Sequence, residues 1–138
     1  MTEADANKAL LQTAYRKWHE SRGGTMEELL EMCDDDIRFD SLAQGAAPLQ
    51  FTSPRSGRAQ LRGYFDGLLS GWSMNHFTVH SMIAEGDRVA VIATTSWTNK
   101  STGKSVETPK IDVWRLKNSR AIEFYEYYDT ALVMAAAT

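Results

Sequence analysis

Two aspartates in this chain are of the kind from which an acid/base site is built. Asp40 ends the acidic segment DDDIRFD at residues 34–40, and Asp112 interrupts an apolar pattern at residues 111–116. A carboxylate that faces an apolar interior costs free energy unless it is neutral, ion-paired or used in a reaction. Two carboxylates in different surroundings can divide the roles of acid and base between them. The pattern therefore indicates a candidate site for proton transfer.

Each aspartate also has a purely structural interpretation. Asp40 can end a strand and cap the loop that follows it. Asp112 can pair with Arg115, or with Lys110, which lies two residues away and therefore on the same face of a strand. The residues alone leave both interpretations open.

The histidines are spaced poorly for a shared metal. His76 and His80 fall on one face of an expected strand, but four residues of strand separate them by about 13 Å, too far for one ion. We therefore expect no metal site. His76 alone remains a candidate for lining a pocket as an acid/base group, whereas His19 is expected to face solvent.

The elements that position these residues begin with helices. Apolar side chains recur at helical spacing in the first segment until Gly23 and Gly24 stop it. Thr25 then opens a capping-box pattern. The expected elements are helices at residues 4–22, from Thr25 and from Gly57, a turn at residues 34–36, a strand at residues 37–41 and a loop at residues 42–56.

The second half of the chain changes to the alternation that is typical of strands. Four strands are expected around residues 77–83, 89–97, 107–116 and 121–131. Helices followed by a meander predict an α+β fold, with three N-terminal helices packed on a curved, mixed but mostly antiparallel sheet that encloses a pocket. Its predicted wall is aromatic and consists of Trp18, Phe39, Phe65, Trp72, His76, Trp97 and Trp114.

Composition limits the possible functions. The 138 residues suffice for one domain, expected to span residues 1–138, and 43% of them are hydrophobic. The net charge of −3 and the lack of a basic run argue against nucleic-acid binding. No apolar stretch is long enough for a membrane span, and the polar first residues predict a cytoplasmic protein. Cys33, the single cysteine, excludes an intrachain disulfide and is expected to be buried and inert.

Several segments resemble the NTF2-like superfamily, and within it the SnoaL-like and ketosteroid-isomerase-like proteins. The resemblance covers nearly the whole chain. It is carried by residues 34–40, SPRSG at 53–57 with LRGYF at 61–65, PKIDVWR at 109–115 and EYYD at 126–129. It implies a cone-like fold that needs no cofactor.

The resemblance also implies roles for individual residues. Asp40 would be the base, Asp112 a protonated donor in the oxyanion hole, and Tyr15 the second donor. Counting back from Asp40 places the tyrosine position on Arg16, next to Tyr15. One residue rotates a helix by about 100°, so only one of the two side chains can face the pocket. Tyr15 also fits the buried stripe of its helix. The alternative interpretation is that Tyr15 serves only in core packing.

The favoured function is therefore isomerisation, or proton transfer, on a small lipophilic carbonyl compound. A SnoaL-like polyketide cyclase or a dehydratase needs the same kind of group and stays an alternative. Epoxide hydrolysis of the limonene-epoxide-hydrolase kind is disfavoured because the corresponding strand, residues 91–95, carries no charge. A non-catalytic binding module is a further alternative. A homodimer through the sheet is expected from the aromatic residues 124–128.

Overall fold

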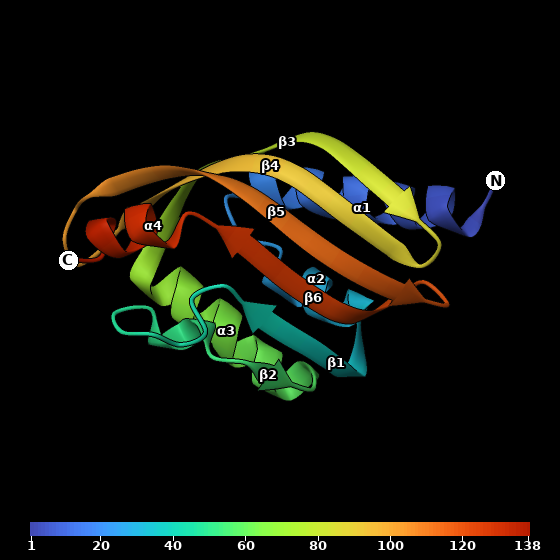
Figure 1. Ribbon diagram of the computed structural model, residues 1–138, viewed down its shortest axis with the longest axis horizontal. Helices are drawn as coiled ribbons and strands as arrows, with labels where there is room; N and C mark the ends of the chain where they lie inside the picture. Colours follow the sequence, from blue (N-terminus) through green and yellow to red (C-terminus); the bar gives the residue numbers. More distant parts are fainter.

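One curved sheet of six strands organises the molecule (Figure 1). The computed structural model describes all of residues 1–138. In spatial order the strands are β2 (Arg55–Ser56), β1 (Cys33–Ser41), β6 (Arg120–Tyr128), β5 (Ser105–Lys117), β4 (Arg88–Asn99) and β3 (Trp72–Glu85). Strands β3 to β6 form an antiparallel meander and β1 runs parallel to β6, so the sheet is mixed. The predicted α+β class is confirmed.

Alternating burial explains how these strands present side chains to the interior. In β4 every second side chain from Val89 to Asn99 is buried. In β5 the same alternation points Lys110, Asp112 and Trp114 toward the helices. The inner face of the sheet therefore carries two charged residues of one strand beside its aromatic side chains.

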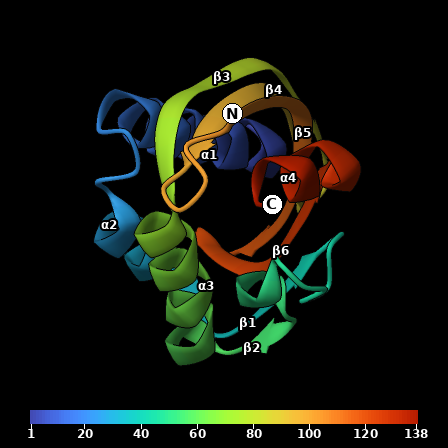
Figure 2. The same ribbon diagram turned by 90° about the vertical axis from the view of Figure 1, so that its left-hand side faces the viewer.

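Four helices accompany the sheet: α1 (Glu3–Glu20), α2 (Met26–Met32), α3 (Arg58–Gly71) and α4 (Thr130–Ala136). Figure 2 shows α1 within the curve of β3 and β4, while α3 lies beside β1. Helix α1 turns Leu11, Tyr15 and Trp18 inward, at the spacing of one helical face. None of the helices combines the length and the apolar character that crossing a membrane requires.

The loop expected at residues 42–56 holds a short 3-10 turn, η1 (Gln50–Thr52), and β2. Gly57 connects β2 to α3 with a φ of 88° and donates its N–H to the Ile37 carbonyl at 2.7 Å. A residue with a side chain is strained at this φ, so glycine fixes where α3 begins.

The first strand starts earlier than predicted. It begins at Cys33, so residues 34–36 are extended rather than a turn. Asp35 and Asp36 are exposed, and the partly exposed Asp34 carboxylate lies 3.7 Å from the Arg120 guanidinium. Exposure lets water solvate the acidic run, which removes the reason for interrupting the strand.

The C-terminal prediction of a strand to residue 131 is wrong beyond Tyr128. Asp129 caps a fourth helix that was not predicted, because its Oδ1 accepts from the Leu132 N–H at 3.1 Å. The strand predicted from residue 77 likewise begins at Trp72, directly after α3. Helix α4 packs against β5, and Trp72 at the start of β3 is buried.

Candidate functional site

The tyrosine of α1 and the aspartate of β5 are in direct contact. The Tyr15 hydroxyl donates to Oδ2 of Asp112 at 2.5 Å, and the Trp114 indole N–H donates to the Tyr15 oxygen at 2.8 Å. Arg16, the next residue of the helix, is exposed. Tyr15, and not Arg16, therefore faces the interior.

A lysine joins Asp112 to a second buried carboxylate. Nζ of Lys110 lies 3.2 Å from Oδ1 of Asp112 and 2.9 Å from Oε1 of Glu126. The two carboxylates stand directly opposite each other on neighbouring strands, with side chains only 2% and 3% exposed. Two buried carboxylates at opposite positions repel each other and lose their hydration. The ammonium between them offsets both costs. Tyr64 of α3 donates to the same Oε1 at 2.7 Å, and we call Tyr15, Tyr64, Lys110, Asp112 and Glu126 the buried array.

Burial and neighbouring charges shift the pKa values of Asp112, Lys110 and Tyr15. Burial raises the pKa of the Asp112 carboxyl above its usual range, although the charge of Lys110 acts in the opposite direction. Burial alone would lower the pKa of Lys110, but the charges of Asp112 and Glu126 outweigh it and raise that pKa. Burial, followed by the charge of Asp112, raises the pKa of Tyr15 well above its usual value. Lys110 therefore stays an ammonium and Tyr15 a neutral donor.

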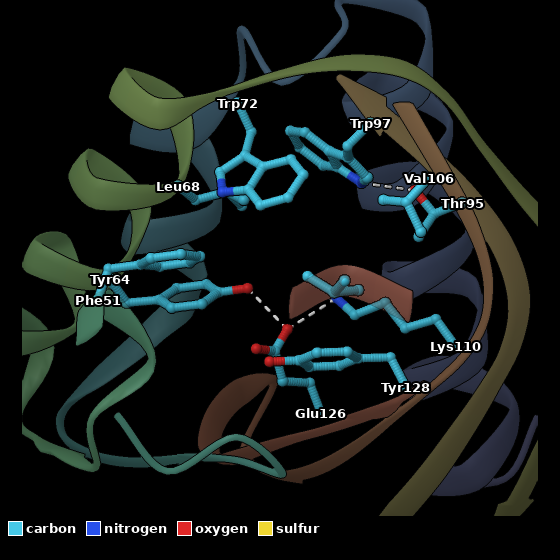
Figure 3. A pocket seen from close by; sticks show the side chains of 11 residues that line it. Phe51, Tyr64, Leu68, Trp72, Thr95, Trp97, Val106, Lys110, Glu126 and Tyr128 are labelled. Carbon is cyan, nitrogen blue, oxygen red and sulfur yellow. Dashed lines mark hydrogen bonds and ion pairs between the residues drawn. The ribbon is translucent and has the colours of Figure 1, made fainter. Parts of the chain in front are cut away.

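Tyr64, Lys110 and Glu126 of the buried array line a cavity of about 60 Å³, which we call the aromatic cavity. In Figure 3 the Tyr64 hydroxyl and the Lys110 ammonium converge on one oxygen of Glu126, with Trp72 and Trp97 across the cavity. The other oxygen of Glu126, Oε2, accepts no hydrogen bond from the protein. The lining residues are Phe51, Tyr64, Leu68, Trp72, Thr95, Trp97, Val106, Lys110, Glu126, Tyr128 and Val133.

A second cavity of about 30 Å³ lies on the other side of Lys110 and is lined by Tyr15 and Asp112. The two cavities share Tyr64, Leu68 and Trp97 as well as Lys110. The buried array thus lies between two small hollows whose walls are mostly apolar. Such walls strengthen the electrostatic interactions of the array, because they exclude water.

Most of the predicted aromatic wall lies around these cavities: Trp72 and Trp97 at the aromatic cavity, and Trp18, Phe65, Trp97 and Trp114 at the smaller one. Phe39 lines neither. Its buried ring packs on Tyr64 and Phe124, with centroid distances of 4.2 and 5.3 Å. Phe39 thus supports Tyr64 from behind.

The structure does not place Asp40 and Asp112 in one cavity. On β1 the neighbours of Asp40 are buried, and Asp40 between them points to the outer face of the sheet. Its Oδ1 accepts the N–H of Ser41 at 2.9 Å, and its side chain borders a surface depression with Tyr125 and Tyr127. Successive side chains of a strand point to opposite faces, so a shift of β1 by one residue would turn Asp40 toward the interior.

His76 also points outward and lines neither cavity. Its ring is 31% exposed, and its Nε2 lies 2.8 Å from Oε1 of Glu107. His80 on the same strand bonds to Thr94 at 2.8 Å. A β-bulge between Met74 and His76 sets which side chains of β3 face inward. No three or more His, Cys, Asp and Glu side chains gather where one metal ion could be held.

Sequence reasoning missed two members of the buried array, Tyr64 and Glu126. A signal for Glu126 was present, because Phe124, Glu126 and Tyr128 alternate onto one face of the last strand. A carboxylate in the middle of an aromatic face is the same pattern that singled out Asp112. Tyr64 carried no comparable signal, because an aromatic residue on an inward helix face is ordinary core.

The fold has clear relatives among solved structures. An NTF2-like protein of unknown function from Burkholderia pseudomallei superposes with a TM-score of 0.83 at 22% identity, over 96% of this chain and 97% of that one. A putative SnoaL-like polyketide cyclase from Mesorhizobium loti gives 0.73 at 21% identity, over 93% and 100%. A Catenulispora acidiphila protein with a ketosteroid isomerase-like fold, in complex with trimethylamine, gives 0.75 at 17% identity, over 92% and 90%. These likenesses show the fold.

Comparison at the sequence level identifies the family. No curated protein matches the chain. The model of the SnoaL-like domain matches residues 13–124, a span that includes all of the buried array except Glu126. The chain therefore belongs to the SnoaL-like family and has the NTF2-like fold that its sequence predicted.

Proposed function

We propose that the aromatic cavity catalyses cofactor-free proton transfer on a small lipophilic carbonyl compound, with Glu126 as the base. The observation that carries this proposal is the division of labour between the two oxygens of Glu126. Oε1 is held by Tyr64 and Lys110, whereas Oε2 accepts no hydrogen bond from the protein. A fixed carboxylate with one free oxygen in an apolar cavity is a suitable general base.

The reaction moves one proton and one electron pair. Oε2 of Glu126 takes a proton from the carbon next to the substrate carbonyl, and the electrons of that C–H bond form the carbon–carbon double bond of an enolate. The Lys110 ammonium forms ion pairs with Asp112 and Glu126 and has three N–H groups. An N–H group of this ammonium can donate to the enolate oxygen and stabilise its developing charge.

Asp112 and Tyr15 act through Lys110 in this proposal. Asp112 fixes the ammonium from the side away from the aromatic cavity, and Tyr15 with Trp114 fixes the Asp112 carboxylate. Preorganised groups need little rearrangement when charge develops in the transition state. This role differs from that of an oxyanion-hole donor, which the family resemblance implies for Asp112 and Tyr15.

The enolate has two possible fates, which distinguish the two activities that the family suggests. Return of the proton to a different carbon is isomerisation, as in a ketosteroid isomerase. Attack of the enolate carbon on a second carbonyl of the same molecule is cyclisation, as in a polyketide cyclase. Both begin with the same proton abstraction, so the buried array supports them equally.

Cavity size favours a small substrate. An apolar cavity of about 150 Å³ holds one benzene molecule. The aromatic cavity of about 60 Å³ is smaller, so it takes only the reacting end of a ligand as it stands. A fused-ring steroid enters only if side chains at the cavity move, and we therefore propose a small carbonyl compound.

The test is exchange of the protons next to a ketone. Cyclopentanone, cyclohexanone and acetophenone are each incubated with the protein in D₂O, and loss of the α-proton signal is followed by NMR. Wild-type protein should accelerate exchange of at least one ketone, and Glu126→Gln should reduce that acceleration about 10²- to 10⁴-fold, the usual contribution of a general base. Asp40→Asn is the matched control, because it also neutralises one carboxylate of the sheet.

Each pattern of rates has one meaning. Loss in Glu126→Gln with retention in Asp40→Asn supports the proposal. The reverse pattern assigns the base to Asp40, as the family resemblance implies. No acceleration of any of the three ketones by folded wild-type protein contradicts proton abstraction from carbonyl compounds in this cavity.

A second candidate function is the binding of a small organic cation without turnover. Two buried carboxylates face a single ammonium in the array, and Trp72 and Trp97 offer their ring surfaces to a cation. The Catenulispora relative is in complex with trimethylamine. Calorimetric titrations with trimethylammonium chloride and with tert-butanol, a neutral molecule of similar shape, separate the two functions. A cation-binding protein prefers trimethylammonium and does not accelerate exchange of ketone protons.

We further propose a homodimer through the outer face of the sheet. Ile111 and Tyr127 are paired across β5 and β6, and both side chains are exposed. Of the aromatic segment 124–128, Phe124, Glu126 and Tyr128 point inward, so Tyr125 and Tyr127 supply the outer surface. Light scattering of wild type and Ile111→Glu tests this: a dimer that the variant dissociates supports it, and a wild-type monomer contradicts it.

A further inference from the structure

A groove between α1 and β3 is larger than either cavity described above. Its volume is about 450 Å³, within the range of about 300–1,000 Å³ that is usual for small-molecule sites. Figure 2 shows α1, which forms one wall, beneath the curve of β3, which forms the other. The floor includes the rings of Tyr15 and Phe77, and Val79 and Met82 add apolar surface.

The groove is cationic although the chain carries a net charge of −3. No aspartate or glutamate lines it. The guanidinium of Arg16 on its wall forms no ion pair and no hydrogen bond within the protein. An unpaired guanidinium presents a planar set of N–H donors that matches a carboxylate.

Two further donors face the same groove. Nδ1 of His19 accepts the backbone N–H of Phe77 at 3.0 Å, so in the neutral ring the proton sits on Nε2, which is a donor. The same bond shows that the Phe77 N–H points away from β4, to the free edge of the sheet. The direction of the N–H groups alternates from one residue to the next along a strand. Val79 is two residues after Phe77, so its N–H also points to the free edge, where no strand accepts it.

We propose that this groove binds a small organic carboxylate. The carboxylate pairs with Arg16 and accepts from the free strand edge at Val79, and its apolar body lies on the floor beside Met82. A single guanidinium and an apolar floor fit one carboxylate on a hydrocarbon body. The site is separate from the aromatic cavity, so it does not depend on the function proposed there.

The experiment is an NMR titration of ¹⁵N-labelled protein with benzoate. Benzamide, which has the same shape without the charge, and inorganic phosphate, which has charge without an apolar body, are titrated in parallel. Benzoate should shift the amide signals of Arg16, His19 and Val79, and not those of Lys110 or Glu126. Saturation is expected in the millimolar range, because a partly exposed ion pair gives modest affinity.

Two variants with the same change in charge locate the interaction. Arg16→Gln should weaken benzoate binding at least about fivefold, as loss of roughly 1 kcal/mol of pairing requires. Lys17→Gln, the next residue of the helix, lines a different hollow and pairs with Glu28 at 3.2 Å, so it should change the affinity little.

Several results would overturn the proposal. Equal shifts with benzamide would show that the charge is not recognised, and equal affinity for phosphate would show that the apolar floor is not used. Equal weakening by both variants would indicate a general charge effect. Absence of shifts at the groove amides below about 10 mM benzoate would exclude a site of the expected affinity.

Discussion

Strand β5 carries two cations, each held between two carboxylates, on opposite faces of the sheet. Lys110 on the inner face lies 3.2 Å from Asp112 and 2.9 Å from Glu126. Arg115 on the outer face lies 2.7 Å from Asp87 and 3.6 Å from Glu123.

Burial separates these two clusters. The inner carboxylates are 2% and 3% exposed, whereas Asp87 and Glu123 are 37% and 25% exposed. Inside, burial raises the pKa of Asp112, whereas outside the hydrogen bond from Arg115 lowers the pKa of Asp87. The same stoichiometry therefore gives an aspartate with a raised pKa on one face and an aspartate with a lowered pKa on the other.

Removing the cation of the inner cluster should have the largest effect on stability. Lys110→Met leaves Asp112 and Glu126 buried opposite each other without compensation, and we expect a loss of about 3–5 kcal/mol in the free energy of unfolding. Burial raises the pKa of Asp112, and loss of the Lys110 charge removes the main opposing effect, so the contribution of Asp112 to stability is greatest at low pH and falls as pH rises. Denaturant unfolding at pH 5 and pH 8 should show the larger loss at pH 8. An equal, small loss at both values would mean that water already solvates the inner cluster.

The next largest effect concerns Tyr15 at high pH. Its pKa is raised well above the usual value by burial and by Asp112, so above about pH 10 the unfolded chain loses a proton that the folded chain keeps. Stability therefore falls as pH rises, by up to about 1.4 kcal/mol per pH unit for this group. Tyr15→Phe should reduce the slope of the unfolding free energy between about pH 10 and 11 by that amount. An unchanged slope would place Tyr15 outside the apolar interior.

A smaller effect on stability is expected when one carboxylate of the inner cluster is neutralised and its cation is kept. Glu126→Gln keeps an oxygen for Tyr64 and Lys110 but removes the charge that helps to raise the pKa of Asp112. We expect the Asp112 pKa to fall and the stability to change by less than about 1 kcal/mol. A titration of Asp112 that is the same in wild type and variant would show that the two carboxylates are not coupled.

The outer cation should matter least. Arg115→Met removes exposed ion pairs that are screened by salt, so its effect on stability should be a small fraction of that of Lys110→Met. High salt should remove what remains of the effect. A loss comparable to that of Lys110→Met would contradict burial as the difference between the faces.

The elements of the site were largely predictable from the sequence, whereas its pairing was not. The helical stripe of Leu11, Tyr15 and Trp18 and the alternation around Asp112 indicated correctly which side chains are buried. These patterns depend only on the period of one element, which a single sequence contains.

The partner of Asp112 depends on a register that the sequence does not show. The tight turn after Lys117 pairs Lys117 with Arg120. Continuing that register would place Asp112 opposite Tyr125, whose side chain points outward. A bulge between Arg115 and Leu116 shifts the pairing by one residue and brings Glu126 opposite Asp112 instead.

The positions of Asp40 and His76 were missed for a related reason. Each lies on a strand next to a residue that faces the interior, so a shift of one residue reverses its direction. Family resemblance placed Asp40 in the pocket, and the pattern of β1 places it outside. Helix α4 was missed because it has only seven residues and begins directly after the strand, although Asp129 was a possible cap signal.

The most direct test of the account is the titration of Asp112 and Asp87 side by side. Carboxyl carbons of ¹³C-labelled aspartate report both groups in one NMR experiment, with Asp112→Asn and Asp87→Asn to assign the signals. The account predicts that Asp112 titrates above the ordinary aspartate value of about 3.9 and Asp87 below it. An Asp112 carboxyl that titrates at or below Asp87 would contradict it, because the inner cluster would then be a structural ion pair like the outer one.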